Sequence, residues 1–284
     1  QETIGIVVKA KVAKSKKARY LSKTETHFRM QMLMLVSDEK DVAEIYSPPR
    51  IAQKATEMGL KGGWSLDFTT HDADGRRWDF SKADMRERAL DKIKSDKPLF
   101  LIGSPMCTDW STLMNINWAR MKPEEKVRRM KEARVHLRFC VKLYKLQTDS
   151  GRYFVHEHPK QAGSWKEPEV KKMISKEKNI LAEIDQCQYG LWIEDDFGWA
   201  LSKKPTRFLT NSPAVAAELQ RKCPGVHTHS ENRHAILFKG RSKKAQVYPD
   251  PLCKAICRGI SKQIELDKNG NFHHATLNVE EAVY

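Results

Sequence analysis

Between residues 42 and 102, short apolar runs alternate with charged stretches. The apolar runs have the length and the flanking turn residues of buried strands, and the stretches between them begin with the proline or serine that often starts a helix. The pattern predicts strands at 42–46, 64–68 and 99–102 and helices at 50–58 and 82–95. Strands and helices in this alternation indicate an α/β fold, and we expect a doubly wound, mostly parallel sheet.

The second half of the chain continues the alternation with weaker signals. Apolar residues at helical spacing predict a long helix over 123–150, which Gly151 ends. The other elements expected are a strand at 153–156, a charged helical segment at 160–184, a short strand at 186–189, an acidic loop around 194–196, a strand at 205–211 and a helix that closes the fold and extends to residue 264.

These elements predict four segments in the chain. They are a basic arm or strand pair (1–40), a catalytic core (41–211), a short basic loop region (212–247) and a closing helix with a C-terminal tail (248–284). The first residues lack the pattern of a signal peptide, so we expect the chain to be an internal fragment of a longer one.

The chain of 284 residues carries a formal net charge of +15. This excess favours a polyanionic partner, most simply nucleic acid, over a soluble protein whose basic charge is merely spread out. No apolar run approaches the length of about eighteen residues that a membrane span needs, so no membrane partner is expected. Six cysteines are too few for a secreted disulfide scaffold and favour a reducing nucleus or cytoplasm. A monomer is expected.

The strand at 99–102 leads into a tight turn that presents Cys107. In open α/β sheets, chemistry concentrates at the carboxyl ends of the strands, so Cys107 stands where a catalytic loop is expected. The alternative is a half-buried structural cysteine.

Four motifs together resemble those of the cytosine-C5 DNA methyltransferases. The sequence 103–111, GSPMCTDWS, resembles that family's Gly-Pro-Pro-Cys loop with methionine in place of the proline before Cys107. The sequence 156–159, HEHP, resembles the family's Glu-Asn motif with histidine in place of asparagine. Segment 203–209, with Arg207, is similar to the arginine strand, and 248–252 is similar to the closing motif. The resemblance implies the Rossmann-like fold of S-adenosylmethionine-dependent methyltransferases.

The resemblance also implies a mechanism, methyl transfer to carbon 5 of a cytosine flipped out of DNA. Cys107 would be the nucleophile that adds to carbon 6, and Glu157 would hold or protonate ring nitrogen 3. Arg207 would brace the base carbonyl or Glu157, and a phosphate-binding arginine is the alternative.

For the cofactor, S-adenosylmethionine, the resemblance implies that Asp67 takes the ribose hydroxyls and Asp79 the adenine amine. The first loop departs from the family's glycine-rich pattern, because its prolines remove N–H donors. Either the cofactor binds there with altered contacts or it does not bind. The expected cofactor-binding residues are Tyr46, Ser47, Pro48, Asp67, Phe68, Asp79, Phe80, Ser104 and Pro105.

The basic segment 212–247 occupies the place of the family's target-reading domain but is too short to fold alone. We expect binding dominated by phosphate contacts, with little sequence specificity. The expected nucleic-acid-binding residues are Ser111, Arg241, Lys243 and Lys244.

The same segment contains a group of residues that could hold zinc, although contacts with phosphate or solvent are the commoner use of such histidines. These residues are Cys223, His227, His229 and His234. Cys253 and Cys257 share one helix face and are expected in the core.

An alternative function is a catalytically silent nucleic-acid-binding module that retains the methyltransferase fold, as one part of a mobile-element polyprotein. Methylation of an exocyclic amine is a third possibility, but it uses a Pro-Pro-aromatic loop that segment 104–107 does not match.

Overall fold

The computed structural model describes residues 39–112, 114–225, 233–238 and 240–280. The chain divides into two units, Gln1–Asp38 and Glu39–Tyr284, and the described residues all belong to the second unit. Nearly all of the basic arm predicted at 1–40 therefore lies outside the described residues.

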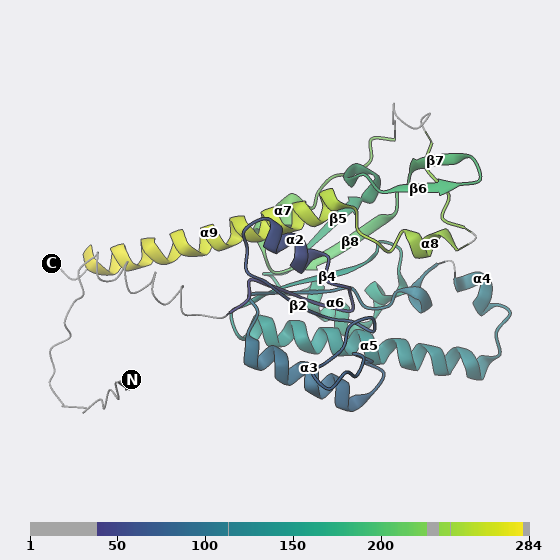
Figure 1. Ribbon diagram of the computed structural model, residues 1–284, viewed down its shortest axis with the longest axis horizontal. Coiled ribbons are helices and arrows are strands. Elements are labelled where there is room, and N and C mark those ends of the chain that lie inside the picture. Colours follow the sequence, from purple (N-terminus) through teal and green to yellow (C-terminus); the bar gives the residue numbers. More distant parts are fainter. Residues whose placement is uncertain (1–38, 113, 226–232, 239, 281–284) are drawn as a thin grey trace, which may run out of the picture. The chain divides into compact units, whose positions relative to one another are not determined.

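Six strands form one sheet in the order β2-β1-β3-β4-β8-β5 (Figure 1). Strands β2, β1, β3 and β4 are parallel, and β8 runs antiparallel to both of its neighbours. The bounds are β1 Val42–Ile45, β2 Gly62–Leu66, β3 Phe100–Gly103, β4 Tyr153–Pro159, β5 Ile180–Asp185 and β8 Pro205–Thr210. The prediction of an α/β fold with a doubly wound, mostly parallel sheet is confirmed.

Each face of the sheet is covered by its own helices, because successive strand side chains point to opposite faces. Val42 and Phe100 pack with α2, α7 and α9, whereas Ala43 and Leu101 pack with α3 and α5. Figure 1 shows these two groups of helices on opposite sides of the sheet. The helices are α2 Ile51–Glu57, α3 Ala83–Asp96, α4 Met114–Trp118, α5 Pro123–Asp149, α6 Pro168–Ile174, α7 Pro213–Glu218, α8 Arg241–Lys244 and α9 Asp250–Glu280.

Three expectations between residues 160 and 196 are wrong. The segment 160–184 contains the 3₁₀ helix η2 (Gly163–Lys166) and the short helix α6 before it becomes strand β5, whose pairing with β8 is a long-range contact. Residues 186–189 form a 3₁₀ helix, η3 (Gln186–Tyr189), instead of a strand. The acidic stretch 194–196 belongs to a hairpin of β6 (Trp192–Asp195) and β7 (Gly198–Leu201), in which basic side chains from farther along the chain neutralise the carboxylates.

The basic segment 212–247 contains regular structure. Its helix α7 is capped by Ser212, whose side chain accepts the N–H of Val215, and the helix packs against α9. Farther along, Ala235 and Ala245 join an apolar cluster with residues of the β6–β7 hairpin. Part of the segment and the hairpin thus share a small core of their own.

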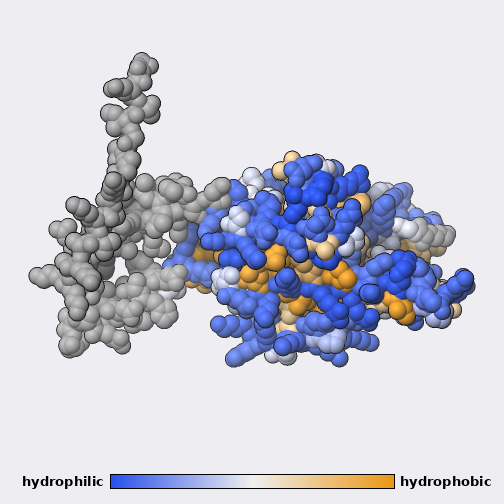
Figure 2. Space-filling model, turned by 90° about the horizontal axis from the view of Figure 1, so that it is seen from below, coloured by the Kyte–Doolittle hydropathy of each residue, from blue (hydrophilic) through white to orange (hydrophobic). Residues whose placement is uncertain are grey.

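Among the described residues, no helix combines the length and the apolar character that crossing a bilayer requires. Figure 2 views the molecule from the side of α3 and α5, and a strip of hydrophobic residues crosses an otherwise largely hydrophilic face. Cys253 and Cys257 are buried in the core between α9 and the sheet, as predicted.

Candidate active site

Strand β3 presents Cys107 through a turn that only glycine permits at its start. A side chain at Gly103 would place its Cβ 2.0 Å from the hydroxyl oxygen of Tyr144 on α5. The chain then turns through Ser104 and Pro105 to Cys107, which precedes the 3₁₀ helix η1 (Thr108–Trp110). The Cys107 side chain is partly exposed at the carboxyl end of β3, as the sequence predicts.

Glu157 occupies the carboxyl end of the neighbouring strand β4. The parallel register pairs Gly103 with His156, so the chain leaves β3 at Ser104 beside Glu157, which still pairs with Phe208 of β8. The Glu157 side chain is buried, and its Oε1 has no hydrogen-bond partner among the described residues. Tyr248 donates its hydroxyl to this carboxyl and lies 2.8 Å from Ser104 Oγ. A buried carboxyl oxygen without a partner is available to a ligand.

Lys204 supplies a positive charge near Cys107 and Glu157, and sequence analysis did not identify it. Its ammonium group donates to the Ala245 carbonyl at 2.7 Å and lies 6.0 Å from the centre of the Tyr248 ring. Its φ of 30° is strained for a residue other than glycine, as backbone at functional sites often is. The signal that could have identified it is a lysine directly before the proline that opens strand β8.

The charges of Glu157 and Lys204 influence the protonation of Cys107, and Lys204 influences that of Glu157. Burial raises the pKa of Cys107, the nearby charge of Glu157 raises it further, and Lys204 opposes both. Burial also raises the pKa of Glu157, with Lys204 and the Tyr248 hydroxyl opposing. The structure therefore brings Cys107, Glu157 and Lys204 into one electrostatic unit, in which neutral thiol and neutral carboxyl are favoured more than in water.

Arg207 is not part of this unit. Strand β8 pairs Arg207 with His158 and Phe208 with Glu157, so Arg207 and Glu157 point to opposite faces of the sheet. The Arg207 Nε lies 2.7 Å from Glu183 Oε1 on β5. The structure thus does not place Arg207 where it could brace Glu157.

His158 supports the Cys107 loop from the opposite face of β4. Its Nε2 donates to the Pro105 carbonyl at 2.9 Å, so its Nδ1 accepts from the Ser164 hydroxyl at 2.6 Å. Burial lowers the pKa of His158 to about 4, which keeps the imidazole neutral in this role. His158 therefore positions the turn before Cys107.

The first loop, at the end of β1, is held by internal contacts. Tyr46 adopts a φ of 59°, and its hydroxyl lies 2.9 Å from His136 Nδ1. Ser47 is buried, its hydroxyl donates to the Pro48 carbonyl at 3.0 Å, and its own carbonyl accepts from the Ser65 hydroxyl. These polar groups already have partners in the loop itself, on β2 and on α5.

Two predicted cofactor residues, Phe68 and Asp79, line one cavity of about 370 Å³. The Phe68 ring is 55% exposed, and the Arg77 guanidinium lies 5.3 Å from its centre. Asp67 and Asp79 each accept from the hydroxyl and backbone N–H of a residue two positions later, at 2.6–2.9 Å for Asp67 and 2.7–3.1 Å for Asp79. Phe80 is buried in the core with α3.

The predicted nucleic-acid-binding residues differ in their surroundings. Ser111 directly follows η1, in the loop of Cys107. Arg241 pairs with Asp196 at the turn of the β6–β7 hairpin, whereas Lys243 and Lys244 are exposed on α8. Only the two lysines thus present charge outward from this helix.

Of the residues suggested for zinc, Cys223 and His234 lie together, and Cys187 joins them. One ligand atom from each of the three lies within 4.8 Å of the other two. His227 and His229 lie outside the described residues.

Comparisons with known proteins do not assign the chain to a family. No protein-family model matches the chain, and no curated protein matches it. Among solved structures it is similar to the Entamoeba histolytica methyltransferase EhMeth, with a TM-score of 0.35 and 10% sequence identity over 61% of this chain. The matched region spans about half of that protein, 52% of its chain.

Proposed function

We propose that the protein transfers a methyl group from S-adenosylmethionine to carbon 5 of cytosine in DNA, through a covalent bond to Cys107. The observation that carries this proposal is the buried Glu157 oxygen that has no partner among the residues that the structure describes, beside a partly exposed thiol. A carboxyl that is held neutral can donate to a ring nitrogen, and a thiol is the side chain best suited to add to a polarised ring carbon.

The three side chains divide the reaction among them. As the Cys107 Sγ bonds to carbon 6, the partly exposed thiol gives its proton to a water molecule and the ring electrons shift toward nitrogen 3. Glu157 delivers a proton to that nitrogen, so the ring does not accumulate negative charge. Lys204 then faces the Glu157 carboxylate that remains and stabilises it. Carbon 5, now enamine-like, would form a bond to the methyl group as the bond between that group and the cofactor's sulfur breaks, which leaves a neutral thioether. Water then takes the carbon-5 proton, nitrogen 3 returns its proton to Glu157, and the Cys107 thiolate leaves as the ring regains its aromaticity.

The cavity beside Phe68 offers chemistry that fits an adenosine group. An exposed aromatic ring can stack on a purine, and a carboxylate such as Asp79 can accept from an exocyclic amine. The bound cofactor would supply an electrophilic methyl group on a sulfonium. Calorimetry should show that Asp79→Ala and Asp67→Ala each weaken its binding by about 1–3 kcal/mol. Equal affinity in wild type and both variants would contradict this assignment.

The partner that we propose is DNA, with contacts at the β6–β7 hairpin and α8. The hairpin exposes Trp192, Phe197 and Trp199 by 42%, 76% and 63%, and Lys243 and Lys244 are exposed on the neighbouring segment. Exposed aromatic rings beside basic groups are the chemistry by which proteins hold unstacked bases and phosphates. Such a surface can bind a DNA strand without contacts to many base edges, which favours low sequence specificity.

The test of the function is methyl transfer itself. The protein is incubated with DNA and cofactor labelled on the methyl group, and the DNA is digested to nucleosides. We expect 5-methylcytosine, and a loss of about 10²–10⁴-fold for Glu157→Gln, since a general acid is removed. Cys107→Ser should abolish it, whereas Cys253→Ala, which removes a thiol from the core, should not. Label on an exocyclic amine in place of carbon 5 would overturn the proposal.

A second candidate is a nucleic-acid-binding module without catalysis. The first loop favours it, because Ser47 is buried and its hydroxyl and carbonyl already bond to Pro48 and to Ser65 on β2. Under this alternative, the wild-type protein binds DNA but gives no heat with S-adenosylmethionine in calorimetry.

A further inference from the structure

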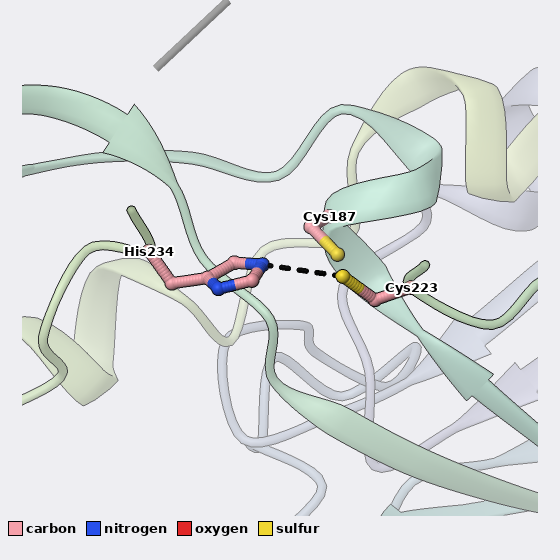
Figure 3. A group of neighbouring side chains, drawn as sticks. All are labelled: Cys187, Cys223 and His234. Carbon is pink, nitrogen blue, oxygen red and sulfur yellow. Dashed lines mark hydrogen bonds between the residues drawn. The ribbon is translucent and has the colours of Figure 1, made fainter. Parts of the chain in front are cut away.

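Three segments that are far apart in the sequence meet beside the start of β8. Cys187 belongs to η3, Cys223 follows α7, and His234 lies before the apolar residues that pack on the hairpin. Figure 3 shows the two sulfur atoms facing one another, with the His234 ring directed at Cys223. Their ligand atoms all lie within 4.8 Å of one another.

The spacing matches a tetrahedral metal site. Zinc binds thiolate sulfur at about 2.3 Å and imidazole nitrogen at about 2.0–2.1 Å, so a tetrahedral angle separates the two atoms by about 3.6 Å. The distance between Cys223 Sγ and His234 Nε2 is 3.5 Å. Side-chain adjustments of about 1 Å would bring Cys187 to the distance that two zinc-bound sulfurs require.

Backbone and side-chain N–H groups already point at both sulfur atoms. Gly225 donates its N–H to Cys223 Sγ at 3.3 Å, and its φ of 89° makes glycine the natural residue for this turn. Gln188 Nε2 lies 3.9 Å from Cys187 Sγ. N–H groups donated to sulfur stabilise a thiolate, which is the form that binds metal.

The backbone around the three residues is also held in place. The N–H of Cys223 donates to Asp185 Oδ2 at 2.9 Å. Beside His234, the Arg233 guanidinium donates to both oxygens of Asp195, and the N–H of Ala235 donates to the Leu201 carbonyl. The cluster is thus positioned by contacts that do not depend on a metal ion.

We propose that Cys187, Cys223 and His234 bind a zinc ion as its three protein ligands, with a water molecule in the fourth tetrahedral position. Two sulfurs and an imidazole nitrogen suit zinc and do not suit magnesium or calcium, which take oxygen ligands. On binding, the two thiols release their protons to the solvent, and the ion bonds to two thiolates and to the neutral His234 Nε2.

A metal ion at this site would link the basic segment 212–247 to the sheet. Cys187 follows Gln186, whose side chain donates to Thr206 Oγ1 on β8 at 3.0 Å. Cys223 and His234 belong to the segment that also carries Ala245, the acceptor of the Lys204 ammonium group. A metal ion here would therefore fix the part of the chain that holds Lys204 beside Glu157, but the site stands whether or not the protein transfers methyl groups.

The test begins with the metal content of the full chain, purified under reducing conditions without chelators. Elemental analysis should find about one zinc per chain. After removal of zinc, titration with Co²⁺ should give the absorption of a thiolate–cobalt bond, which reports ligand identity without any variant. Cys187→Ala and Cys223→Ala should each lose the zinc or weaken it at least about tenfold. Cys253→Ala, the same change at a buried thiol on α9, should retain it.

Three other outcomes would each overturn the proposal. Trace zinc together with no thiolate–cobalt absorption would leave only a thiol–imidazole hydrogen bond. A Cys187–Cys223 disulfide that persists in the reduced preparation, seen by mass spectrometry, would assign the pair to redox chemistry. Zinc that both alanine variants retain in full would belong elsewhere in the chain.

Discussion

The support that His158 gives to the Cys107 loop makes a prediction about stability that depends on pH. In the folded protein the neutral imidazole donates to the Pro105 carbonyl and accepts from the Ser164 hydroxyl. The substitution His158→Asn shortens the side chain and breaks both contacts. At neutral pH this should lower the free energy of unfolding by about 1–3 kcal/mol, because buried partners lose their hydrogen bonds.

The size of the pH effect follows from the pKa of His158, which burial lowers from 6.5 to about 4. A depressed pKa means that the folded state resists protonation, so the wild-type protein loses stability as the pH falls below the unfolded value. The stability is fully present above pH 6.5 and is lost progressively toward pH 4. The full loss is about 3 kcal/mol, since each pKa unit corresponds to about 1.4 kcal/mol.

The assay is urea unfolding followed by tryptophan fluorescence at about pH 7.5 and about pH 4.5, and the quantity compared is the difference between the wild type and His158→Asn. Carboxylates that titrate in the same window contribute equally to both proteins and cancel in this difference. The stability advantage of the wild type should shrink by about 2–3 kcal/mol at the lower pH. Ser164→Ala, which removes one hydrogen bond but keeps the imidazole, should retain the wild-type pH dependence. An advantage that stays constant between the two pH values would refute the buried, neutral His158.

Two further predictions concern positive charge. Lys204→Met should raise the pKa of Cys107, because Lys204 lowers it, and so shift the alkylation of Cys107 by iodoacetamide to higher pH. The control is Lys203→Met, which removes a neighbouring exposed lysine and should leave the pH profile of alkylation unchanged. Equal shifts in the two variants would contradict the role of Lys204. Replacing both Lys243 and Lys244 with alanine should reduce the slope of log affinity against log salt by about 1.8 on duplex DNA, and an unchanged slope would place the phosphate contacts elsewhere.

The sheet could be predicted from the sequence where burial alone decides the structure. Strand β3 has a continuous apolar run, and its neighbours in the sheet are covered on both faces. Strand β5 was not predictable, because it follows a charged segment and becomes a strand only through its pairing with β8. The β6–β7 hairpin was missed for a similar reason, since Asp195 and Asp196 are neutralised by arginines from the later basic segment.

The residues of the candidate active site also differ in whether the sequence could predict them. Cys107 and Glu157 could be identified because each follows a recognisable strand and parallel strands end at the same edge of the sheet. Lys204 was missed, although a lysine directly before the proline of β8 was the signal for it, because its surroundings depend on contacts with Tyr248 and Ala245. Cys187 likewise joins Cys223 only through the fold, because no local spacing links them.

The measurement that tests the central claim most directly is covalent capture of Cys107 by DNA that contains 5-fluorocytosine. Fluorine at carbon 5 prevents the proton loss that would release the enzyme, so the bond between Sγ and carbon 6 should persist. With S-adenosylmethionine present, we expect a denaturation-resistant adduct whose mass spectrum maps to the Cys107 peptide, and none with Cys107→Ser. A wild-type protein that binds both the cofactor and this DNA yet forms no adduct at Cys107 would contradict the account.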